Sequence, residues 1–231
     1  MTPTSTSTSS TFQPLTGPLG FYPVVPTADW VQRLLGWGVR TVQLRIKAAD
    51  HGPAEIAAQV KAAIEAGRAV PGAQVFINDH WPLALAHGAY GVHLGQEDLD
   101  TADTADIGAL RQAGMRLGLS THTPAELARA HAVQPSYLAI GPIYPTTLKV
   151  MPYAPVGLAQ LALWAQQAAL FPRLPVVAIG GISLERLPGV MACLSGPHDG
   201  VAVVSAVTLA GDAQQAAQDG MRLVLSARQA G

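Results

Sequence analysis

The stretch QVFINDHWPLALAHGAYGVHL (residues 74–94) contains the repeating unit that decides the fold of this chain. It begins with an apolar run, QVFIN (74–78), continues through HWPLALAHG (80–88), and returns to a second apolar run, GVHL (91–94). Short runs that are apolar throughout are typical of parallel strands covered on both faces, and the middle segment has the apolar spacing of a helix. The stretch therefore predicts a strand–helix–strand unit.

The same alternation runs from Phe21 toward the C-terminal end, with Ala-rich, helix-like segments between short apolar runs. The predicted strands are FYPVV (21–25), TVQLRI (41–46), QVFIN (74–78), GVHL (91–94), RLGLS (116–120), YLAIG (137–141), VVAIG (176–180) and GVAVVSA (200–206). This rhythm predicts an α/β protein that folds as a single (β/α)8 TIM barrel. The alternative is an open doubly wound sheet. PTADW (26–30) disfavours it, because no Gly-rich dinucleotide loop follows the first run.

Composition narrows the class of protein. Of 231 residues, 49% are hydrophobic and 13% are charged, which suits an enzyme domain with buried strands. The net charge of −1 provides no basic field for nucleic acid or an anionic membrane, and no apolar run approaches membrane-spanning length. The only cysteine, Cys193, excludes internal disulfides and favours a reducing compartment, so we expect a cytoplasmic location. Small molecules are the expected partners, and a homo-oligomer remains open.

The N-terminal stretch differs in composition from the rest of the chain. MTPTSTSTSSTFQPLTGP (1–18) is rich in Ser and Thr and has no apolar segment of the kind found in secretory signals. We expect residues 1–19 to form a flexible tail and residues 20–231 to form one catalytic barrel domain.

Polar side chains gather where the predicted strands end. In a (β/α)8 barrel, the C-terminal ends of the strands and their loops form one rim, on which the chemistry takes place. The residues concerned are Gln43, Arg45 and Lys47; Asn78 and Asp79; His93, Gln96, Glu97 and Asp98; Ser120 and His122; Thr146, Thr147 and Lys149; Gly180 and Gly181; and Ser205. Such one-sided placement predicts an active site at this rim.

Asp79 and Asp98 follow consecutive predicted strands. Parallel neighbours are spaced by about 5 Å, so these carboxylates can converge. Carboxylate oxygens with room for water and phosphate suit Mg²⁺. Taken singly, each acid also fits a helix cap or a turn. Asn78 favours the ligand interpretation, because its amide can donate to a phosphate oxygen.

Three basic residues, Arg45, Lys47 and Lys149, lie at the same predicted rim. Each alone is compatible with a solvated surface charge. Together with a metal they match a pyrophosphate clamp, in which positive groups neutralise a leaving group.

Gly180-Gly181 and Val204-Ser205 follow the last two strands. Loops at these positions of a barrel frequently bind a phosphate monoester through backbone N–H groups. The alternative for the glycine pair is a tight turn.

The histidines suggest little acid–base catalysis. His93 lies within a predicted strand and fits an interior, hydrogen-bonded residue. His122 follows Ser120 at the rim and is a candidate proton carrier. No Ser-His-Asp order or nucleophile elbow is present, so hydrolase chemistry has little support.

Several of these stretches together resemble one enzyme family. QLRIK (43–47), INDHWPLALAHGAYGVHLGQEDL (77–99), LGLSTHTPAEL (117–127), YLAIGPIYPTTLK (137–149), VAIGGIS (177–183) and GVAVVSAV (200–207) are similar, in this order, to the motifs of the thiamine-phosphate synthases. The resemblance covers nearly everything from Phe21 to Val207. It implies a (β/α)8 barrel that joins hydroxymethylpyrimidine diphosphate to hydroxyethylthiazole phosphate, with Mg²⁺-assisted release of pyrophosphate.

The resemblance also implies a role for each residue of the site. The pyrimidine diphosphate is expected to contact Gln43, Arg45, Lys47, Asn78, Ser120 and Lys149. Lys149 and Ser120 are the residues expected to act in catalysis. Asp79 and Asp98 are expected to hold Mg²⁺, and the thiazole phosphate is expected to contact Thr146, Thr147, Gly181, Val204 and Ser205. Leu148 departs from the family pattern, because it stands where the family usually has a second Thr before the Lys.

Two alternatives remain. A related thiazole tautomerase has a similar fold and would use His122 as its proton carrier, but Lys47, Asp79, Asp98 and Lys149 favour the synthase. A non-catalytic phosphate-binding barrel has less need of both a metal and cationic side chains.

Overall fold

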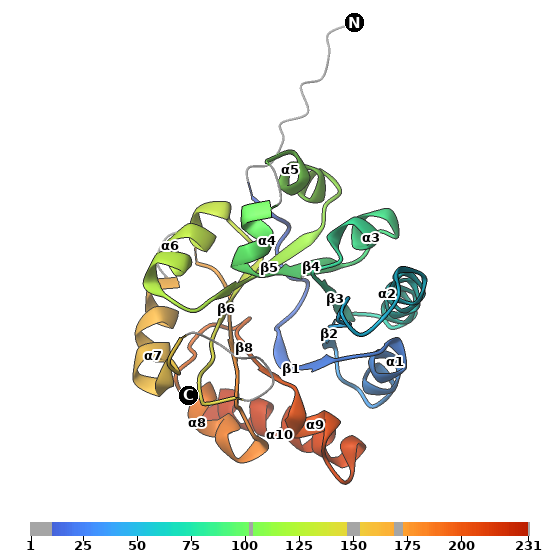
Figure 1. Ribbon diagram of the computed structural model, residues 1–231. Coiled ribbons are helices and arrows are strands. Elements are labelled where there is room, and N and C mark those ends of the chain that lie inside the picture. Colours follow the sequence, from blue (N-terminus) through green and yellow to red (C-terminus); the bar gives the residue numbers. More distant parts are fainter. Residues whose placement is uncertain (1–10, 102–103, 147–152, 169–172, 231) are drawn as a thin grey trace, which may run out of the picture.

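The computed structural model describes residues 11–101, 104–146, 153–168 and 173–230. Its strands form a closed barrel in which β1 pairs with both β2 and β8, and all pairs are parallel (Figure 1). Strand order around the barrel follows the sequence, and helices surround the strands. The predicted (β/α)8 TIM barrel is confirmed, and the open sheet is excluded by the β1–β8 pairing.

The strands lie close to the predicted runs. They are β1 (Gly20–Val25), β2 (Thr41–Leu44), β3 (Gln74–Asn78), β4 (Gly91–Leu94), β5 (Arg116–Thr121), β6 (Tyr137–Ile140), β7 (Val176–Ile179) and β8 (Gly200–Val203). The last run, predicted to reach residue 206, ends earlier. Val204 has φ −120° and ψ −82°, so the backbone leaves the extended conformation there and α9 begins at Ser205.

The helices are α1 (Ala28–Gly36), α2 (Pro53–Arg68), α3 (Trp81–Ala86), α4 (Gln96–Thr101), α5 (Thr104–Gln112), α6 (Pro124–Val133), α7 (Gly157–Ala168), α8 (Leu187–Met191), α9 (Ser205–Thr208) and α10 (Ala213–Ala230), with the 3-10 helix η1 (Leu184–Arg186) before α8. Thr27 and Thr123 cap α1 and α6 through their side chains, and Pro124 occupies the first turn of α6. No helix within the described ranges is both long and apolar enough to cross a membrane.

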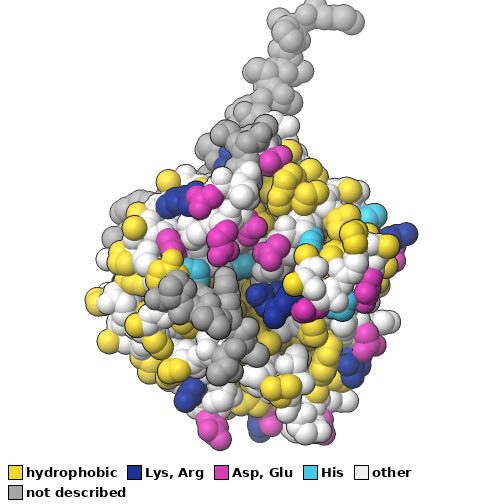
Figure 2. Space-filling view, viewed as in Figure 1, with side chains coloured by type: hydrophobic (Ala, Val, Ile, Leu, Met, Phe, Trp, Pro, Cys, Tyr) yellow, Lys and Arg dark blue, Asp and Glu magenta, His cyan; other side chains and the backbone are white. Residues whose placement is uncertain are grey.

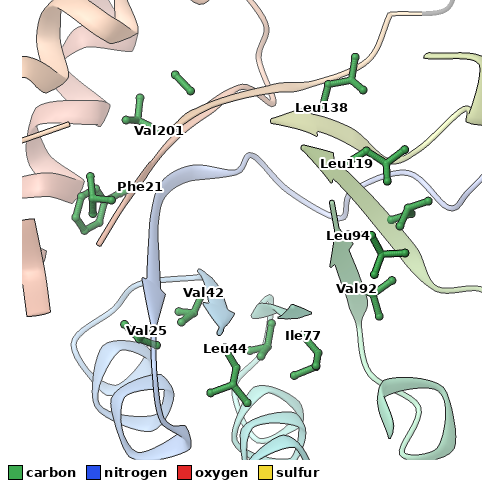
Figure 3. Packing of buried hydrophobic residues seen from close by; sticks show 14 of the residues in the cluster. Phe21, Val25, Val42, Leu44, Ile77, Val92, Leu94, Leu119, Leu138 and Val201 are labelled. Carbon is green, nitrogen blue, oxygen red and sulfur yellow. The ribbon is translucent and has the colours of Figure 1, made fainter. Parts of the chain in front are cut away.

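Alternation along the strands separates two apolar layers. The outer layer packs between strands and helices, and it includes Val42 and Leu44 of β2 and Ile77 of β3 (Figure 3). The inner layer fills the barrel and includes Tyr22 and Phe76. Because side chains on a strand point alternately to its two faces, the residues between the outer ones project into the barrel.

The N-terminal segment is the main departure from the predicted fold. Residues 11–19 were expected to belong to a flexible tail, yet Phe12 is 5% exposed and Leu19 is 1% exposed. Leu15 and Leu19 join the inner layer, and the Phe12 N–H donates to Gln134 O at 3.2 Å. The prediction of a tail relied on the Ser/Thr-rich composition and gave no weight to these apolar residues. Their burial holds the segment against the barrel. Residues 1–10 lie outside the described residues.

Polar groups under the barrel bond to one another. Tyr90 Oη donates to Gln74 Oε1 at 2.6 Å, and Gln74 Nε2 donates to Thr41 Oγ1 and to Pro18 O, both at 3.1 Å. The Thr16 N–H donates to Tyr90 Oη at 3.0 Å. The N-terminal end of the barrel is therefore closed by residues that satisfy each other's hydrogen bonds.

Candidate active site

A cavity of about 660 Å³ opens at the C-terminal ends of the strands. Every strand, or the residue that directly follows it, contributes to its wall. Those contributions are Val24 from β1, Gln43 and Arg45 from β2, Asn78 from β3, His93 from β4, Ser120 from β5, Gly141 from β6, Ile179 from β7 and Ala202 from β8. Acidic and basic side chains gather around the middle of the face seen in Figure 2. This is the rim at which the sequence places the site.

Most of the residues predicted for the site line this one cavity. They are Gln43, Arg45, Asn78, Asp79, Asp98, Ser120, Thr146, Gly181, Val204 and Ser205. Lys47 is different: it is exposed in the loop after β2 and is not part of the wall. Thr147, Leu148 and Lys149 lie outside the described residues. The structure thus brings together both predicted metal ligands, one of the three predicted cations and the glycine loop.

Asp79 has an unusual backbone conformation. Its φ is +61°, in the left-handed region that few residues other than glycine enter. Its N–H donates to His93 O at 3.1 Å on the neighbouring strand, and its carbonyl accepts from the Trp81 N–H at 2.7 Å. Such strain is maintained only where the surrounding structure fixes it, and it is common at functional sites. Here it places the Asp79 side chain on the cavity wall.

Asp98 both organises a turn and lines the cavity. Its Oδ2 accepts from the Gly95 N–H at 2.7 Å at the start of α4. The turn role considered as an alternative is therefore real, and it fixes the carboxylate at the wall. Among the described residues, no group of three or more His, Cys, Asp or Glu side chains is arranged to hold a metal. Two carboxylates facing one cavity fit Mg²⁺, which completes its shell with water and phosphate oxygens.

The loops after β6 and β7 pack tightly against each other. Gly180 and Gly181 have φ of +102° and +66°. A Cβ on Gly181 would lie 2.5 Å from Pro145 O, and a Cβ on Gly180 would lie 2.6 Å from Pro142 Cα. Only glycine fits at these positions. The glycine pair therefore forms the tight turn considered as an alternative, and the same turn lines the cavity. The Tyr144 N–H donates to Gly180 O at 3.0 Å, which holds the two loops together beside Thr146.

His122 is held at the cavity wall by a carboxylate that sequence reasoning missed. Glu126 Oε2 accepts from the His122 N–H at 2.7 Å and lies 2.8 Å from His122 Nδ1. Tyr153 stacks on the His122 ring at 5.1 Å and donates through Oη to Glu126 Oε1 at 3.1 Å. The signal was present in the sequence, because Thr123 and Glu126 have the spacing of a capping box at the start of α6.

His93 lies in the cavity floor, and its predicted place as an interior, hydrogen-bonded residue is confirmed. Its Nε2 is 2.8 Å from Ser120 Oγ, and its Nδ1 is 2.7 Å from Tyr137 Oη. Burial lowers the His93 pKa to about 3, and the positive charge of Arg45 acts in the same direction, as does His122. Burial likewise raises the pKa values of Tyr22 and Tyr137. All three side chains are therefore neutral near pH 7.

Comparison with known proteins agrees with this geometry. A family model described as thiamine monophosphate synthase matches residues 21–207. The chain belongs to this family. A thiamine-phosphate synthase of Pectobacterium atrosepticum is 51% identical over 216 residues, which are 94% of this chain and 96% of the relative. One from Yersinia pseudotuberculosis is 53% identical over 206 residues, which are 89% of this chain and 90% of the relative.

A solved structure of a family member has the same fold. The thiamine phosphate pyrophosphorylase of Pyrococcus furiosus superposes with a TM-score of 0.73 at 29% sequence identity, and the match covers 90% of this chain and 96% of that one. Family membership confirms the resemblance inferred from the sequence motifs.

Proposed function

We propose that the protein joins hydroxymethylpyrimidine diphosphate to hydroxyethylthiazole phosphate and releases pyrophosphate. One observation carries the proposal. Asp79 and Asp98, the cation Arg45 and the Gly181 loop all line a single cavity, in a chain of the thiamine monophosphate synthase family. Two phosphorylated substrates require carboxylates that can bind a metal ion, a cation that can bind phosphate, and a glycine loop whose N–H groups can bind phosphate.

The diphosphate half of the site is assigned to the strands β2, β3 and β5. Arg45 can bind phosphate oxygens through its planar guanidinium group, and Asn78 can donate an amide N–H. Gln43 is buried and also lines the cavity, and we assign it to the pyrimidine ring. Ser120 completes this wall, and Lys47, from the loop after β2, is proposed to reach the diphosphate. Lys149, which lies outside the described residues, is proposed to bind the diphosphate as well.

Magnesium is assigned to Asp79 and Asp98. When bound there, Mg²⁺ would neutralise the charge that develops on the leaving pyrophosphate. Asp98 is held in place by its bond with Gly95, and Asp79 by its fixed backbone. These two acids therefore offer a preorganised pair of oxygen ligands.

The thiazole phosphate is assigned to the opposite part of the wall. Gly181, Thr146, Val204 and Ser205 line it, and Thr147 adjoins it in sequence. Backbone N–H groups in such glycine loops bind phosphate without adding a side chain that would crowd the ligand. Leu148 replaces the usual Thr, so Thr147 or a backbone N–H is assigned its contact.

The reaction proposed for these residues is dissociative. The bond between the pyrimidine methylene carbon and the diphosphate oxygen breaks with its electron pair on oxygen, and the thiazole nitrogen then supplies the pair for the new carbon–nitrogen bond. Apolar residues of the wall, among them Val24 and Ile179, limit access of water, which would trap the cation. No general base is needed, which agrees with the neutral state of His93.

The direct test combines purified protein, Mg²⁺ and both substrates. We expect pyrophosphate release and thiamine phosphate formation in equal amounts, and neither product when Mg²⁺ is replaced by a chelator. A folded protein that forms no thiamine phosphate from authentic substrates would overturn the proposal.

One observation favours a second candidate, the thiazole tautomerase. His122 is held by Glu126 at the cavity wall, as a proton carrier would be. Incubation with a thiazole phosphate tautomer alone separates the two candidates, because only a tautomerase would convert it without the pyrimidine. A phosphate-binding barrel without catalysis would instead bind both substrates and change neither.

One further assignment accompanies the proposal, and it concerns the location of the protein. The single cysteine supports a cytoplasmic location. A homo-oligomer is left to measurement of the mass in solution.

A further inference from the structure

A continuous chain of hydrogen-bonded side chains crosses the barrel beneath the cavity. Gln43 Nε2 donates to Tyr22 Oη at 3.1 Å, and Tyr22 Oη lies 2.9 Å from Tyr137 Oη. Tyr137 Oη lies 2.7 Å from His93 Nδ1, and His93 Nε2 lies 2.8 Å from Ser120 Oγ. The chain thus begins at one cavity residue, Gln43, and ends at another, Ser120. Its three intermediate members have no part in the reaction proposed above.

The direction of the protons along this chain follows from its first member. The Gln43 amide nitrogen can only donate, so Tyr22 Oη accepts from it. Geometry alone allows either hydroxyl of the Tyr22–Tyr137 pair to be the donor, but the buried Tyr22 proton has an acceptor among the described residues only if it points to Tyr137 Oη. Tyr137 Oη, having accepted this proton, donates its own to His93 Nδ1. A neutral imidazole whose Nδ1 accepts carries its proton on Nε2, and this N–H faces Ser120 Oγ.

We infer that Tyr22, Tyr137 and His93 are positioning residues, which fix the Ser120 hydroxyl as a hydrogen-bond donor to the substrate. With His93 donating to Ser120 Oγ, the hydroxyl proton of Ser120 is directed away from the ring and into the cavity. The inference rests on the proposed function, because it assigns the recipient to the pyrimidine diphosphate. The group recognised is a hydrogen-bond acceptor, either a ring nitrogen or a diphosphate oxygen.

The packing of the barrel makes room for this chain. A Cβ on Gly118 would lie 2.1 Å from Cζ of Tyr137, so only glycine in β5 lets the tyrosine ring cross the barrel interior. The ring then stacks on His93, with centroids 5.6 Å apart and planes 27° apart. Glycine in a strand weakens it, and a phenylalanine would fill the same space without a hydroxyl to satisfy. The tyrosine hydroxyl therefore serves the orientation of His93.

The tautomer of His93 is measurable without any substrate. In protein labelled with ¹⁵N at histidine, long-range ¹H–¹⁵N spectra distinguish a protonated Nε2 from a protonated Nδ1, and His93→Gln assigns the signal among the seven histidines. We expect the Nε2–H form near pH 7. Tyr137→Phe keeps the ring and removes the donor to Nδ1, so the Nδ1–H form should become populated. An Nδ1–H form in the wild-type protein would overturn the inference.

Kinetics test whether this orientation acts through Ser120. We expect Tyr137→Phe to lower kcat/KM about tenfold, as the loss of one hydrogen bond implies, and Tyr22→Phe to lower it less, because Tyr137 can still donate to His93. In a Ser120→Ala background, Tyr137→Phe should have no further effect. A merely structural tyrosine would lower kcat/KM by the same factor in both backgrounds, and that result would contradict the inference.

Tyr90→Phe is the matched control. It also removes a tyrosine hydroxyl that is hydrogen-bonded to other side chains, but this hydroxyl lies at the N-terminal, closed end of the barrel. We therefore expect neither the His93 tautomer nor kcat/KM to change.

A binding experiment identifies the acceptor. Inorganic pyrophosphate and the unphosphorylated hydroxymethylpyrimidine are titrated separately into the wild-type protein and into Ser120→Ala. Weakened binding of the first assigns the acceptor to the diphosphate, and weakened binding of the second assigns it to the ring. Unchanged binding of both would contradict the donor role. If the wild-type protein is inactive while His93 carries its proton on Nε2, the proposed function fails, but the inferred direction of the hydrogen bonds from Gln43 to Ser120 is still supported.

Discussion

The polar residues at the two ends of this barrel differ in what they contact. At the N-terminal end, Tyr90 bonds to Gln74 and to Thr16, which belongs to the segment anchored by Phe12 and Leu19. At the C-terminal end, polar side chains face a cavity of about 660 Å³. Polar groups that are satisfied internally stabilise the fold, whereas polar groups directed into a cavity are available to a ligand. Changes at the open end should therefore alter activity, and changes at the closed end should alter stability.

The largest effect is expected at the open end. Asp79→Asn removes a proposed Mg²⁺ ligand, and asparagine tolerates the φ of +61°. We expect kcat/KM to fall about 1000-fold, because charge on the leaving group loses its stabilisation. The thermal unfolding midpoint without ligands should not change. The matched control is Asp29→Asn on the outside of α1, where kcat/KM should stay at the wild-type value. Equal losses of kcat/KM in Asp79→Asn and Asp29→Asn would contradict a specific role of the open end in activity.

The next effect is expected at the closed end. Leu19 is 1% exposed, and Leu19→Ala leaves a cavity in the inner layer. We expect the free energy of unfolding, measured by urea denaturation, to fall by about 3 kcal/mol, with kcat/KM of the folded protein unchanged. Leu209, at 78% exposed, provides the control, because Leu209→Ala should change stability by no more than about 0.5 kcal/mol. A loss of activity in folded Leu19→Ala protein would show that the two ends are coupled.

A third prediction concerns His93, which lies between the two ends. Its pKa in the folded protein is about 3, below the ordinary value of 6.5. Stability gained by keeping the ring neutral is complete above pH 6.5 and is lost as the pH falls toward 3, because only the unfolded chain takes up the proton. This loss is about 2 kcal/mol between pH 7 and pH 5. We therefore expect the free energy of unfolding, measured by urea denaturation, to fall by about 2 kcal/mol more in the wild-type protein than in His93→Gln between pH 7 and pH 5. Parallel pH curves would contradict the burial of a neutral ring.

The smallest effect sharpens the role of the polar network at the closed end. Tyr90→Phe removes the hydroxyl that joins Gln74 to Thr16. We expect the free energy of unfolding to fall by about 1 kcal/mol, the usual net value of a hydrogen bond. Phe76→Leu would instead disturb the aromatic packing around Tyr90, so a larger loss in that variant separates packing from hydrogen bonding.

Local patterns in the sequence were sufficient for the barrel and for most of the rim. Gln43 and Arg45 alternate with the apolar Leu44, a pattern that indicates one face of a strand, and both line the cavity. Alternation gives no position for Lys47, because β2 ends at Leu44, and Lys47 is exposed in the loop that follows. Lys149 lies outside the described residues, so its catalytic role remains a prediction.

Features that depend on distant contacts were beyond the reach of local patterns. Phe12 and Leu19 were concealed by a Ser/Thr-rich composition, because their burial depends on surfaces formed by remote segments. The bond between Tyr22 and Tyr137 joins residues 115 positions apart, and no periodicity reports such a pairing. Register between strands, which brings these side chains together, becomes visible only in the closed barrel.

The central claim is that Asp79 and Asp98 hold one divalent cation at the open end. Mn²⁺ can replace Mg²⁺ as a paramagnetic probe, and amide NMR signals then broaden according to their distance from it. With Mn²⁺ and inorganic pyrophosphate, we expect the strongest broadening at Asp79, Gly95 and Asp98, the weakest at Thr16 and Gln74, and none of this pattern in Asp79→Asn. Broadening centred on the closed end, or a pattern that persists in Asp79→Asn, would contradict the claim.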